Sequence, residues 1–220
     1  AKLVASLAGP VAPGEFAQAA GGATDPIGKI ETISGIVQIT RVDGTKVTAK
    51  KGDDVFQGDV IETAADASIG MALADDSVFS LDGDARAVLD EMVYDPGEDT
   101  GKMGISLVSG VMSFVSGQIS KNDPDSMVLK TPVATIGIRG TSGSVESGET
   151  TQVVLTQEAG GVVGEMVVKT EGGVQVLNSP LQSTNISDPT KPPPAPIVLS
   201  AEVYSQKFGS SVAAVNNTLS

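Results

Sequence analysis

The chain of 220 residues contains no histidine, no cysteine and no tryptophan, and each absence removes a class of function. Without histidine there is no imidazole metal site, no Ser-His-Asp relay and no common general base near neutral pH. Without cysteine there is no thiol nucleophile, no disulfide framework and no thiolate cage for zinc or an iron–sulfur cluster. These absences favour a protein that is not an enzyme and that holds no cofactor.

Basic residues are also scarce, at 14 against 27 acidic residues, which gives a formal net charge of -13. Because such a surface repels phosphate groups, we expect no binding to nucleic acid. No apolar run approaches the roughly 18 residues that a membrane-spanning helix needs, so the sequence predicts no transmembrane segment.

Four regions differ in composition, and each is predicted to be a separate structural unit. Residues 1–27 are rich in Ala, Gly and Pro and form a predicted non-regular tail. Residues 28–178 form a predicted β domain. Residues 179–196 hold six of the twelve prolines, which favours a polyproline II linker. Residues 197–220 are predicted to contain a short amphipathic helix, in which Ser200 is the N-cap and Gly209 follows the last apolar residue.

Short runs of Val, Ile and Thr fill residues 28–178, and turn signals interrupt them about every 8–12 residues. We expect about a dozen short strands and no helix in this region. Asp43-Gly44 is a predicted hairpin turn, and Ser109-Gly110 is expected to separate strands at 104–108 and 111–115. The pattern predicts an all-β fold, either a short β-solenoid or a β-sandwich, and does not choose between them.

Several motifs occur in a fixed order along this region. They are Gly35-Ile36-Val37, Arg41-Val42-Asp43-Gly44, Lys51-Gly52-Asp53, Gln57-Gly58-Asp59, Leu73-Ala74-Asp75-Asp76-Ser77 and Thr131-Pro132-Val133-Ala134-Thr135-Ile136-Gly137-Ile138-Arg139-Gly140-Thr141. Together they resemble the FecR-type domain over about residues 28–145. Residues 89–96 and 114–119 are similar to the variant of this domain at the N-terminal end of large bacterial RTX or cadherin-like surface or secreted repeat proteins.

The resemblance implies a non-enzymatic structural or adhesive module of the bacterial cell surface or extracellular matrix. We expect such a module to self-associate, even into fibres, through exposed β edges and terminal tails, or to bind neighbouring modules of a surface assembly. The alternative that the resemblance offers is a periplasmic FecR-like domain that senses and relays a signal.

Two sets of residues are candidates for a site. Asp82 and Asp84 flank Gly83 and could bind calcium through carboxylate oxygens, although aspartates in solvated turns have the same pattern. The segment that begins with Thr131 and Pro132 ends in Arg139, Gly140 and Thr141. We predict that Arg139 is partly buried and holds this segment to the sheet by binding a carboxylate or backbone carbonyls. The glycine-rich loop at 137–144 could instead bind an anion through its N–H groups, but it lacks the ending of a nucleotide-binding P-loop.

Overall fold

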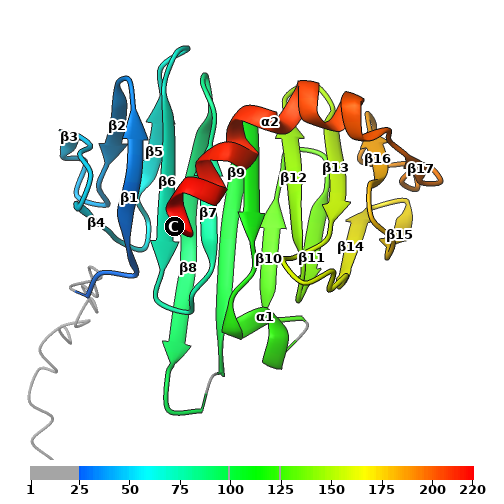
Figure 1. Cartoon of the computed structure of the whole chain (residues 1–220), viewed down its shortest axis with the longest axis horizontal. Helices are drawn as coiled ribbons and strands as arrows, with labels where there is room; N and C mark the ends of the chain where they lie inside the picture. The colour runs from blue at the N-terminus through cyan, green and yellow to red at the C-terminus, as the bar shows by residue number, and fades with distance from the viewer. Residues whose placement is uncertain (1–24, 99, 124) are drawn as a thin grey trace, which may run out of the picture.

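The computed structural model describes residues 25–98, 100–123 and 125–220, so most of the predicted N-terminal tail lies outside the described residues. The described residues form seventeen strands and two helices, and hydrogen bonds connect all the strands into one mixed sheet. This sheet is folded into two layers, with helix α2 (Ala201–Thr218) lying across one of them (Figure 1).

We call the layer under α2 the front layer and the other the back layer. In spatial order, the front layer contains β4 (Asp54–Val55), β1 (Gly28–Ser34), β6 (Ser68–Leu73), β7 (Val78–Leu81), the end of β9 (Thr100–Val115), β12 (Ser142–Ser147), β13 (Thr151–Thr156), β16 (Gln182–Ile186) and β17 (Ile197–Val198). The back layer contains β3 (Lys46–Thr48), β2 (Val37–Thr40), β5 (Val60–Thr63), β8 (Arg86–Asp95), the start of β9, β10 (Met127–Lys130), β11 (Thr135–Arg139), β14 (Glu165–Thr170) and β15 (Gly173–Leu177). Neighbouring strands are antiparallel, except that β10 runs parallel to β9.

Strand β9 joins the layers, because it pairs with β8 up to Ser109 and with β12 from Gly110 onward. The prediction that Ser109-Gly110 separates two strands is therefore wrong. Gly110 has a φ of 92°, and a Cβ there would lie 2.4 Å from Cα of Ala85. The glycine thus lets one long strand cross between the layers while a neighbouring segment passes close by.

The core lies between the two layers and confirms the all-β prediction. Phe79 and Phe114 are neighbours on β7 and β9, with ring centroids 6.0 Å apart, and both are almost fully buried. The predicted number of strands was too low, and the one-turn helix α1 (Gln118–Asn122) was not predicted at all. Strands of two or three residues, such as β4 and β17, are too short to leave an alternating pattern in the sequence.

Helix α2 confirms the predicted C-terminal helix and its start, since the Ser200 side chain accepts a hydrogen bond from Val203 N–H. The helix does not end near Gly209 but continues to Thr218. Phe208 and Ser211, on either side of the glycine, are both fully buried against the sheet. These contacts outweigh the roughly 1 kcal/mol by which glycine disfavours a helix interior.

The predicted linker at 179–196 differs most from the structure, since it contains β16 and lies against the sheet. The Thr170 hydroxyl donates to the Lys191 carbonyl at 2.6 Å, and the Thr184 hydroxyl donates to the Pro194 carbonyl at 2.9 Å. Ile27, assigned to the tail, is likewise part of the body, because its N–H donates to the Val55 carbonyl at 2.9 Å. Proline content alone does not distinguish a spacer from a segment whose carbonyls bind neighbouring strands.

Candidate functional site

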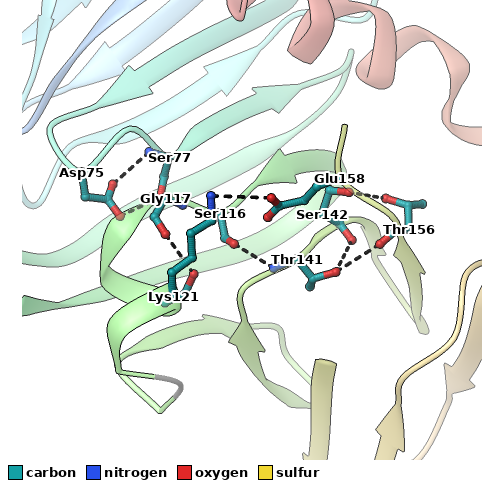
Figure 2. A network of polar contacts seen from close by, with 10 residues as sticks. Asp75, Ser77, Ser116, Gly117, Lys121, Thr141, Ser142, Thr156 and Glu158 are labelled. Carbon is teal, nitrogen blue, oxygen red and sulfur yellow. Dashed lines mark hydrogen bonds and ion pairs between the residues drawn. The ribbon is translucent and has the colours of Figure 1, made fainter. Parts of the chain in front are cut away.

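The predicted site residues Arg139, Gly140 and Thr141 lie where the chain passes from β11 in the back layer to β12 in the front layer. Thr141 is fully buried there. Its N–H donates to Oγ of Ser116 at 2.9 Å, and its own hydroxyl donates to the Thr156 carbonyl at 3.1 Å (Figure 2). These hydrogen bonds hold together three places where the chain leaves or enters the front layer: the end of β9, the connection from β11 to β12, and the end of β13.

A buried carboxylate in the turn between β6 and β7 lies beside the same network (Figure 2). Asp75 is fully buried and accepts hydrogen bonds from Ser77 Oγ at 2.8 Å and from Ile119 N–H at 3.3 Å. The Ser77 hydroxyl in turn accepts from Gly117 N–H at 2.8 Å. Asp75 therefore satisfies the N-terminal turn of α1 from a distant loop, which explains why sequence reasoning missed that helix.

We call Asp75, Ser77, Ser116, Thr141 and Thr156 the crossover clasp. The side chains of Asp75, Ser77, Ser116 and Thr141 bond one another or nearby backbone groups, and the Thr156 hydroxyl bonds the Ser142 hydroxyl. A hydroxyl nucleophile needs an adjacent base that is free to take its proton. In the clasp, the Ser77 hydroxyl donates to Asp75, but this carboxylate also accepts from the N–H groups of Ser77 and Ile119, so these contacts tie segments of the chain together.

Arg139 binds two carboxylates beside the clasp. Its guanidinium contacts Glu165 at 2.5 Å and Asp125 at 2.8 Å, and about 34% of its side chain is exposed. The two bonds join β11 to β14 and to the loop before β10. The sequence singled out Arg139 but gave no signal for either partner, and its contribution to stability stays a prediction.

Thr131 and Pro132 lie in the turn between β10 and β11, away from the clasp. The Thr131 hydroxyl accepts from Ala134 N–H at 3.1 Å and from the Thr151 hydroxyl at 2.9 Å, so it ties this turn to β13. Pro132 is exposed and lies between two surface hollows of about 220 and 450 Å³. Lys130 lines the smaller hollow and Lys169 the larger one.

Asp82 and Asp84 lie in the turn between β7 and β8, which belong to different layers and do not form a hairpin. Asp82 accepts a hydrogen bond from the Ser210 hydroxyl of α2 at 2.9 Å, and Asp84 is exposed with a φ of 56°. Among the described residues, no three acidic side chains come together as a metal site. Calcium binding by this pair stays a prediction.

Sequence reasoning missed the contact between α2 and the front layer. Ser80, Ser113 and Ser144 are direct neighbours on β7, β9 and β12, and we call this row the serine track. Ser113 Oγ lies 2.7 Å from Oγ of both Ser144 and Ser211, and the Ser80 hydroxyl donates to the Ser211 carbonyl at 2.7 Å. Ser144 also bonds the Tyr204 hydroxyl at 2.8 Å.

The helix meets the track with residues spaced alternately by four and three. They are Tyr204, Phe208, Ser211, Val215 and Thr218, the last bonded to Thr32 of β1 at 3.0 Å. This spacing was the available sequence signal, since it marks one helix face. Because serine side chains are small, the helix approaches the sheet closely while its polar atoms stay bonded.

A pocket of about 420 Å³ lies alongside α2. Its lining includes Tyr204, Val212, Val215 and Leu219 of the helix, Ser142 of β12 and Glu158 of the loop after β13. Glu158 is paired with Lys121 at 3.5 Å (Figure 2). The pocket is therefore mixed in character, with an apolar wall from the helix and polar groups from the clasp side.

Comparison with known proteins supports the resemblance seen in the sequence. Residues 59–162 match the family described as FecR protein. No curated protein matches the chain.

The described helices include none that is long and apolar enough to cross a membrane.

Two solved structures are similar to parts of the chain. A candidate anti-sigma factor from Parabacteroides distasonis has 16% sequence identity and a TM-score of 0.50, and the match covers 70% of each chain. A cell surface anchoring domain has 27% identity and a TM-score of 0.28 over 28% of this chain and 82% of its own. At 16% identity, the first similarity concerns the fold alone.

Proposed function

We propose that this FecR-type module is a non-enzymatic structural or adhesive element of the bacterial cell surface, and that copies of it associate through exposed β edges. The observation that supports this most directly is the edge strand β17 at one end of the double-layered sheet (Figure 1). Val174, Ile197 and Val198 at this end are 58%, 63% and 69% exposed. Edge strands with exposed apolar side chains commonly mediate the association of sheets from different molecules.

The bonding of the buried hydroxyls among the described residues supports the non-enzymatic part of the proposal. The chain contains neither histidine nor cysteine, and the buried hydroxyls of the clasp and the serine track bond one another or backbone groups. These groups stabilise chain crossings and hold α2 in place. We assign them no role in catalysis.

Sedimentation velocity of the full chain over a hundredfold range of concentration tests the proposal. We expect the average mass to rise with concentration, and a monomer throughout would contradict self-association. The same series with added calcium and with EDTA tests Asp82 and Asp84, because loss of association in EDTA that Asp82→Asn and Asp84→Asn reproduce would support a calcium site. An unchanged mass in EDTA would reject a role for calcium in assembly.

The alternative function is that of a periplasmic domain that relays a signal. The observation that supports this alternative is the similarity of the fold to the candidate anti-sigma factor. Protease treatment of intact cells that produce the protein separates the two locations. Cleavage in intact cells supports the surface location. Cleavage only after the outer membrane is permeabilised supports the periplasmic one.

A further inference from the structure

The two layers end in four edge strands among the described residues. The front layer ends in β4 and β17, and the back layer ends in β3 and β15. An edge strand presents unpaired backbone groups, so natural sheets protect their edges with charges, prolines or covering segments.

Three of the four edges carry such protection. Lys46 on β3 is exposed, and the exposed Lys50 and Lys51 lie just before β4. At β15 the proline-rich segment packs against the start of the strand, since a Cβ on Gly173 would lie 3.1 Å from Cβ of Pro192. Lysines and prolines at these places oppose the addition of another strand.

Strand β17 has no lysine on or just before it, and Pro196, which directly precedes it, lies outside the strand. The strand lies within a run of ten uncharged residues, 192–201, and both of its side chains are largely exposed. Leu199 N–H donates to the Leu181 carbonyl at 2.9 Å on the β16 side. Because backbone groups alternate in an antiparallel pair, the N–H and C=O of Val198 point away from β16 toward the open edge.

We propose that β17 pairs with β17 of a second copy about a two-fold axis, which makes one continuous front layer across a dimer. This inference rests on the proposed function and specifies its surface and symmetry. Each Val198 would exchange both backbone hydrogen bonds with Val198 of the other copy, as opposed residues do in an antiparallel ladder. Strand β15 and the start of α2 lie at the same end of the sheet (Figure 1), and they carry the exposed Val174 and Val203.

Charge favours a second copy meeting at this edge. Two molecules that each carry a net charge of -13 repel one another over most of their surfaces. Contact is least opposed where charge is missing, and both partners then present the same uncharged run. Because the lysine-bearing edges at the other end resist pairing, the contact closes a dimer and does not continue into a fibre.

Two substitutions test the pairing by sedimentation velocity of the full chain. Val198→Pro removes only the N–H that faces the edge, and Ile197→Lys places like charges across the two-fold axis. Each should weaken the dimer at least about tenfold. Val198→Thr, which keeps the N–H, and Val93→Lys, at a 60% exposed site on β8, should change the dissociation constant less than about threefold.

Because the chain has no cysteine, Val198→Cys provides an independent test that needs no destabilising change. Under mild oxidation it should form a covalent dimer, and Val93→Cys should not. Association that survives both edge substitutions, or assemblies larger than a dimer, would overturn the inference and leave the proposed self-association intact. Monomers of the unaltered chain at every concentration would overturn both, as would association only with a different protein.

Discussion

Removing the central hydroxyl of the serine track should loosen α2 from the sheet. Ser113 Oγ bonds Ser144 and Ser211 at 2.7 Å, and all three residues are buried. A hydrogen bond of this kind contributes about 0.5–1.5 kcal/mol. Ser113→Ala removes two of them, although Ser211 keeps its bond to the Phe208 carbonyl and Ser144 keeps its bond to Tyr204. We therefore expect a loss of about 2 kcal/mol.

Denaturant unfolding followed by circular dichroism measures this loss, which corresponds to about 4–8 °C in Tm for a chain of this size. Ser109→Ala on the same strand is the matched control, since no hydrogen bond of its side chain is found in the described structure and we expect a change under about 0.5 kcal/mol. Amide hydrogen exchange should show faster exchange in α2 and unchanged exchange in the back layer. Equal stability of the two variants, with unaltered exchange in α2, would refute the assigned role of the track.

Three other predictions follow from single residues. Burial raises the pKa of Tyr204 above its ordinary value of 10.0. Above about pH 10 the folded state keeps a proton that the unfolded chain loses, so the free energy of unfolding should fall as pH rises. Tyr204→Phe should flatten that decline in alkaline unfolding curves. A Cβ on Gly209 would meet only Ser205 Oγ, at 3.5 Å, so Gly209→Ala should raise stability by about 0.5–1 kcal/mol in thermal unfolding, and a lower Tm would contradict the assigned space. Arg139→Ala should lower stability by about 1 kcal/mol. Arg86→Ala is the control, because the Arg86–Glu62 pair is more exposed, and it should lower stability by less than about 0.5 kcal/mol. An unchanged Tm for Arg139→Ala would reject its role as a tie.

Local features of the fold could be predicted because local chemistry determines them. Asp43-Gly44 forms the turn between β2 and β3, with Gly44 at a φ of 84°, and Ser200 begins α2. The assignment of strands to layers could not be predicted, because a half-buried strand has the same alternation in either layer. Gly110 illustrates the difficulty, since a glycine that ends a strand and one that lets a strand cross between layers have the same sequence signal.

The candidate site shows the same division. The sequence identified Arg139, because arginine is scarce in this chain, and Thr141, because it ends the motif that begins at Thr131. It could not identify Asp75, because an aspartate in a turn is common and its burial depends on α1 arriving from 44 positions away along the chain. The serine track is equally invisible, since Ser80, Ser113 and Ser144 become neighbours only after β7, β9 and β12 have paired.

The distribution of charge connects the fold with the proposed association. Lys29, Lys46, Lys50 and Lys51 belong to the end of the sheet formed by β1 to β4, where they accompany short edge strands. The opposite end has the uncharged run 192–201, in which Pro192 packs against the start of β15 and both side chains of β17 are exposed. The lysines therefore accompany the edge strands at one end of the sheet, whereas β17 at the other end lies in an uncharged run. Salt screens the repulsion between the remaining acidic surfaces, so added salt should strengthen a dimer formed through β17. A dimer held by ion pairs would instead become weaker as salt is added.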